Sequence, residues 1–85
     1  MDEHEIGQRA SALPDRFASR VSEEVLEGLR LMSEGGEYGE LAIELTAALV
    51  QARASVTAAE QQELRGLLEA TGIPADLAEQ LRVGS

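Results

Sequence analysis

The sequence predicts an all-α protein, a compact bundle of four to five helices joined by short connections. Apolar residues recur at helical spacing in four successive segments. Residue types that begin and end helices stand between these segments, and no segment shows strand alternation of useful length. The 85 residues make one domain, residues 1–85, in which residues 1–3 and 84–85 are expected to be frayed tails.

The first helix is expected from about residue 3 to residue 13. Proline at position 14 removes a backbone hydrogen bond and clashes with the preceding turn, so a kink or a restart is expected there, with helix running on to about residue 19. The apolar residues of this segment step by four, three, four and four along one face: Ile6, Ala10, Leu13, Phe17 and Val21.

The second helix is expected over about residues 23–34. Ser22 is a good N-cap, and the two glutamates after it suit the positive end of the helix dipole. Gly35 and Gly36 end the helix, because glycine readily adopts the left-handed conformation of a C-cap. The apolar residues that should face the core are Val25, Leu26, Leu29 and Met32.

The third helix, expected over about residues 37–53, is apolar on two sides and should therefore lie at the centre of the bundle. Ile43 and Val50 form the narrower of its two apolar stripes. The broad stripe consists of Tyr38, Leu41, Ala42, Leu45, Ala48, Leu49 and Ala52, and a polar band of Glu37, Glu40, Glu44 and Gln51 separates the two.

The fourth helix should begin with a capping box between Thr57 and Glu60 and run to about Thr71. It should bury Leu64, Leu67 and Leu68. Gly72, Ile73 and Pro74 form a strong stop signal, and Pro74 suits the first position of a last short helix that packs through Leu77 and Leu81.

The charge of the chain favours a basic protein as partner. The net charge is −9, and all seven cations are arginine. Such a chain should be repelled by nucleic acid and by anionic membranes and attracted to basic proteins. The absence of cysteine, of a secretory signal and of an apolar run long enough to cross a bilayer leads us to expect a cytoplasmic location.

No catalytic or metal constellation stands out, and we expect neither enzymatic activity nor a cofactor. Glu37, Glu40 and Glu44 share one helical side, but no histidine or Asp/Asn/Gly calcium loop accompanies them. The only histidine, His4, lies in a terminal segment. Glutamates surround the glycines at positions 35, 36 and 39 and would repel phosphate, so these glycines are better explained as a tight turn.

Acidic residues are concentrated in the middle of the chain. Between Ser22 and Glu44 seven glutamates stand against one cation, Arg30. This excess serves solubility, or it forms a face complementary to a basic partner. Tyr38 likewise has two interpretations, a core residue or an anchor at an interface.

One stretch of the chain resembles the Maf-type family of small bacterial immunity proteins. The most specific part of the resemblance is residues 36–39, Gly-Glu-Tyr-Gly, followed by residues 41–45, Leu-Ala-Ile-Glu-Leu. Around it, residues 23–35, Leu49, residues 56–60 and the helix that closes at Gly72 follow the same arrangement. The resemblance covers most of the chain after Val21.

The resemblance implies an antitoxin-like role, in which the protein binds and neutralises a cognate toxin domain that has a basic surface. The alternative is a small helical interaction or regulatory module that forms a homodimer through Ile43 and Val50. For the first function, charge and expected exposure select the following partner-binding residues: Glu23, Glu27, Glu34, Glu37, Tyr38, Glu40 and Glu44.

Overall fold

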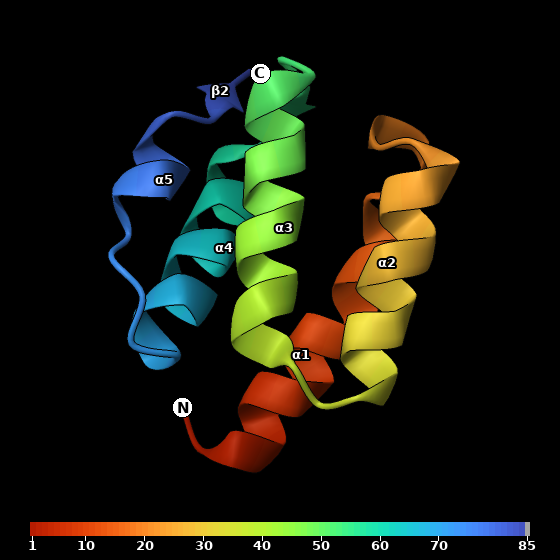
Figure 1. Ribbon diagram of the computed structural model, residues 1–85. Helices are drawn as coiled ribbons and strands as arrows, with labels where there is room; N and C mark the ends of the chain where they lie inside the picture. Colours follow the sequence, from red (N-terminus) through yellow and green to blue (C-terminus); the bar gives the residue numbers. More distant parts are fainter. Residues whose placement is uncertain (85) are drawn as a thin grey trace.

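Helix α3 (Tyr38–Gln51) runs through the centre of the protein, with the other helices arranged around it (Figure 1). In this computed structural model, which describes residues 1–84, α3 packs against α1 (Glu3–Arg16), α2 (Glu23–Glu34), α4 (Ala58–Ala70) and α5 (Asp76–Glu79). The predicted all-α bundle is confirmed, as is the central position of the third helix.

The core lies where α3 meets the helices around it. The broad apolar stripe predicted for α3 supplies much of this core, although Ala52, at its end, is exposed. Of the narrower stripe, Val50 packs against the core and Ile43 is exposed. The buried cluster comprises Leu13, Phe17, Leu29, Leu41, Ala42, Leu45, Leu49, Val56, Leu64, Leu67, Leu68, Ala78 and Leu81.

Of the two alternatives expected at Pro14, a kink or a restart, the structure excludes the restart. The helix does not restart there but continues to Arg16, and the chain then enters a 3-10 helix, η1 (Ala18–Arg20). Pro14 is in the last turn of α1, so it removes only one backbone hydrogen bond near the end of the helix. Pro14 and Leu13 are both buried, and this packing offsets the lost bond.

Three helices end in the same way. A residue with positive φ follows α2, α3 and α4, namely Gly36 (φ 72°), Arg53 (φ 52°) and Gly72 (φ 77°). In each case the N–H groups of this residue and of the next one donate to carbonyl oxygens three and five residues earlier. This is the Schellman arrangement, and it confirms the predicted stops at Gly36 and Gly72. Arg53 is the exception, because a side chain disfavours the left-handed conformation.

The N-terminal caps follow the sequence signals closely. The Ser22 side chain accepts from the Val25 N–H group, and the capping box of Thr57 and Glu60 is formed. The prediction that Pro74 opens the last helix is wrong, because α5 begins two residues later, at Asp76.

Two short strands also differ from the prediction. Strands β1 (Ser55–Val56) and β2 (Arg82–Val83) pair in parallel, although no strand was expected. Near the chain ends, Glu3 begins α1 as expected, and the Gly84 N–H group donates to the Val56 carbonyl at 2.9 Å. Ser85, the other residue of the expected C-terminal tail, lies outside the described residues.

Candidate functional site

Six exposed glutamates on α2 and α3 form the candidate site, which we call the acidic face. All six side chains are exposed, as predicted, on two helices that pack together, with Glu37 at the N-cap of α3. Only the three of α2 line a common groove. Their spacing of three, four or seven residues within each helix keeps them on one side. The acidic face consists of Glu23, Glu27 and Glu34 of α2 with Glu37, Glu40 and Glu44 of α3.

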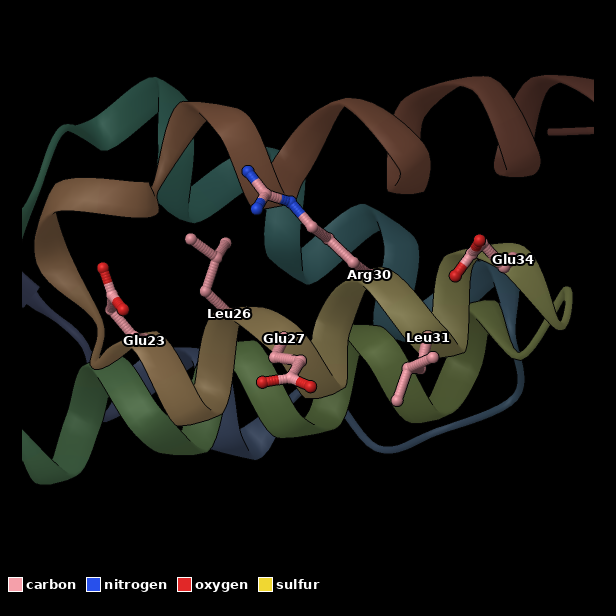
Figure 2. Close-up of a pocket in the computed structure, with 6 residues that line it drawn as sticks. All are labelled: Glu23, Leu26, Glu27, Arg30, Leu31 and Glu34. Carbon is pink, nitrogen blue, oxygen red and sulfur yellow. The ribbon is translucent and has the colours of Figure 1, made fainter.

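The three glutamates of α2 line a shallow groove together with Leu26, Arg30 and Leu31. Figure 2 shows these six side chains along α2, with Arg30 directed toward α1 and Leu31 on the other side of the helix. Leu31 is 63% exposed, the highest value among the large apolar residues of the described chain. The groove therefore combines carboxylates with an apolar side chain that faces water.

None of the six glutamates of the acidic face forms an ion pair within residues 1–84, although Arg30 lines the same groove as the three of α2. The five ion pairs among residues 1–84 use carboxylates from other parts of the protein: Glu5, Asp15, Glu60, Glu63 and Glu79. The nearest cation in sequence, Arg30, is directed away and lies 3.1 Å from Asp15 of α1. Charges left unpaired in this way project a negative potential into solvent.

Glu37 and Tyr38 open α3 but play different roles. Glu37 occupies the N-cap position of α3, yet its side chain makes no capping hydrogen bond and is exposed. Tyr38 is half-buried and packs against α1: a Cβ atom built on Gly7 would lie 3.2 Å from its ring. The structure therefore groups Tyr38 with α1 and the end of α4, where it lines a separate groove with Ile6 and Thr71, and not with the glutamates.

The most perturbed carboxylate, Glu60, belongs to a structural pair outside the acidic face. Both oxygens of Glu60 accept from the Arg20 guanidinium at 2.8 Å. These bonds, supported by the Thr57 N–H group and opposed by burial, lower the pKa of Glu60 to about 2. Arg20 also lies 4.3 Å from the centre of the Phe17 ring and donates to the Ser55 carbonyl at 3.2 Å. This pair joins η1 to the beginning of α4.

The residues that the structure describes contain neither a candidate metal site nor a candidate membrane-spanning helix. No group of three or more Asp, Glu, His or Cys side chains there is placed to hold a metal ion. Nor does any helix within residues 1–84 combine the length and the apolar character needed to span a membrane.

Comparison with known proteins adds no relative. No protein-family model, no curated protein and no solved structure matches this chain. The candidate site therefore rests on geometry and charge.

The sequence prediction missed two residues beside the acidic glutamates, Leu31 and Gly28. Leu31 is off the apolar stripe of α2 and so was not assigned to any surface. An apolar residue on the polar side of an amphipathic helix is the signal that could have revealed it. Gly28 gave a weaker signal, a glycine within a helical pattern.

Proposed function

We propose that the protein is an immunity protein that binds and neutralises a cognate bacterial toxin domain in the cytoplasm of the producing cell. The observation that carries the proposal is the acidic face, on which six exposed glutamates have no ion-pair partner among residues 1–84. Elsewhere the chain pairs five of its carboxylates with arginine.

Charge of this kind favours a basic partner. Unpaired surface carboxylates accelerate association with a cationic surface and exclude partners of like charge. A toxin that acts on nucleic acid needs a basic cleft for phosphate, and an acidic helical surface can occupy that cleft in place of the phosphates. The resemblance to the Maf-type immunity family agrees with this role.

The alternative, a regulatory module that forms a homodimer through Ile43 and Val50, has less support. Val50 packs against the core, so only Ile43, 37% exposed, remains of the apolar stripe that would pair. Two copies of a chain with a net charge of −9 also repel each other.

The first test asks whether the neighbouring open reading frame encodes a secreted protein with a small C-terminal domain. Calorimetry at 50 and 500 mM NaCl then measures the binding of that purified domain to this protein. We expect stoichiometric binding that weakens with salt, and rescue of growth when both proteins are expressed together. The double variant Glu40→Gln/Glu44→Gln should bind about 10-fold more weakly, about 1.4 kcal/mol.

A matched control removes two exposed and unpaired acids elsewhere, Glu69→Gln/Asp76→Asn. Both double variants change the net charge by two. If total charge alone set the affinity, both would therefore bind the toxin domain equally weakly. Equal affinities for the two variants would contradict the assignment to the acidic face, and no binding by the wild-type protein would contradict the function.

A further inference from the structure

We propose that the outward side of α2 docks a basic amphipathic helix of the toxin, with Leu31 as the apolar anchor and Gly28 as the point of closest backbone approach. This inference rests on the proposed function and specifies the part of the acidic face that carries the contact. It is drawn from the exposure of Leu31, the environment of Gly28 and the charges beside them.

Leu31 is placed as an anchor would be. It lines the groove of α2, is 63% exposed, and stands between Glu27 and Glu34 (Figure 2). Single exposed leucines are common on protein surfaces and need no explanation. Here, however, the leucine stands in a groove and between carboxylates that have no ion-pair partner among the described residues.

No packing contact requires a glycine at position 28, one turn before Leu31. A Cβ atom built on it would meet nothing within 4 Å. By contrast, a Cβ atom on Gly7 would lie 3.2 Å from Tyr38, and one on Gly39 would lie 3.3 Å from Thr71, so packing explains those two glycines. A glycine inside a helix weakens it, whereas a bare backbone lets another molecule approach closely.

The charges beside Leu31 define the occupant. Glu27 and Glu34 are seven residues apart, two helical turns, which separates them by about 10 Å along the axis. A partner helix with two Lys or Arg residues seven positions apart, and an apolar residue between them, would match this arrangement. An amphipathic helix in a groove is a recurrent mode of recognition that uses this periodicity.

The test measures the affinity of single variants for the same toxin domain. Leu31→Ser and Gly28→Gln should each weaken binding at least 10-fold. Glutamine is a good helix former, so Gly28→Gln should keep the far-UV circular dichroism spectrum of the wild-type protein.

Two controls match these changes in chemistry but lie elsewhere. Val83→Ser removes another exposed apolar side chain, 46% exposed in β2, and Gly66→Gln fills a glycine of α4. Both should stay within twofold of the wild-type affinity.

The outcomes separate the two proposals. If the wild-type protein binds no toxin domain, both proposals are overturned. If binding is weakened by Glu40→Gln/Glu44→Gln but is unchanged by Leu31→Ser and Gly28→Gln, only the docking helix is overturned. The docking site is supported if the α2 variants bind more weakly while the two control variants keep the wild-type affinity.

Discussion

Replacing Glu60 by glutamine removes the charge that Arg20 binds while leaving the cap of α4 in place. In the wild-type protein both Glu60 oxygens accept from Arg20 at 2.8 Å, and one of them also accepts from the Thr57 N–H group at 2.8 Å. A glutamine side-chain oxygen can still accept from Thr57, because capping boxes use Glu or Gln at this position. The substitution therefore tests the ion pair and not the cap.

The magnitude follows from the pKa of Glu60. A fall from the ordinary 4.5 to about 2 corresponds to at most about 3.5 kcal/mol, since one pKa unit is about 1.4 kcal/mol. The Glu60 side chain is 15% exposed and that of Arg20 27%, so solvent screens the pair, and we expect about 1–2 kcal/mol at pH 7.

The sign of the pH dependence follows from the same pKa. Because the pKa of Glu60 is lower in the folded protein than in the unfolded chain, its contribution to stability is fully present above about pH 4.5. That contribution is lost as the pH falls towards 2, where Glu60 becomes protonated in the folded protein. The deficit of Glu60→Gln relative to the wild-type protein should therefore shrink across this range.

Urea denaturation followed by circular dichroism at pH 7, 5, 3.5 and 2.5 measures the free energy of unfolding in each case. Glu63→Gln is the matched control: Glu63 is on the same helix, but its nearest cation, Arg9, is 3.9 Å away, so its loss should cost less than about 0.5 kcal/mol. Equal deficits for the two variants at pH 7, or a Glu60→Gln deficit that stays constant down to pH 2.5, would show that the ion pair with Arg20 does not stabilise the fold as expected.

Four further substitutions test local features of the helices by the same denaturation assay. Arg53→Gly should raise the free energy of unfolding by about 0.5–1 kcal/mol, because it relieves a side chain at φ 52°; a lower stability would contradict the strain. Thr46→Val should add about 1 kcal/mol, because the buried Thr46 hydroxyl has no hydrogen-bond partner among the described residues. Thr71→Val should instead lower the free energy of unfolding by about 1 kcal/mol, since the Thr71 hydroxyl donates to the Leu67 carbonyl at 2.8 Å. If the two valine substitutions changed stability in the same direction, the assigned hydrogen-bonding states of the two hydroxyls would be wrong. Gly28→Ala should add about 0.5–1 kcal/mol, because its new methyl group meets nothing, and a loss of stability would show that Gly28 is needed for the fold.

Most of the fold was predictable because helix signals are local. The Ser22 cap, the capping box of Thr57 and Glu60, and the left-handed glycines at 36 and 72 act within about five residues of chain, and all are present. Whether the helix restarts at Pro14 depends on packing instead. Local chemistry disfavours proline in a helix, but burial of the neighbouring side chains sustains α1 through it.

The candidate site was predictable in part. Helical periodicity correctly placed the six glutamates of the acidic face on the outside of α2 and α3. Tyr38 could not be placed in this way, because its position at the start of α3 suits either an interface or the packing against Gly7 that the structure shows. Leu31 was missed because periodicity identifies the buried side of a helix and assigns no role to an apolar residue outside it.

Composition and neighbours within a turn or two specify the helices, their ends, the apolar side of each and the excess of negative charge, so these follow from the amino-acid order. Which charges remain without an ion-pair partner depends on how the helices pack. Packing joins Arg20 to Glu60 across 40 residues and directs Arg30 to Asp15, while the glutamates of the acidic face keep no such partner within residues 1–84. An ion pair between distant segments forms only where the folded backbone brings them together, which no local pattern specifies.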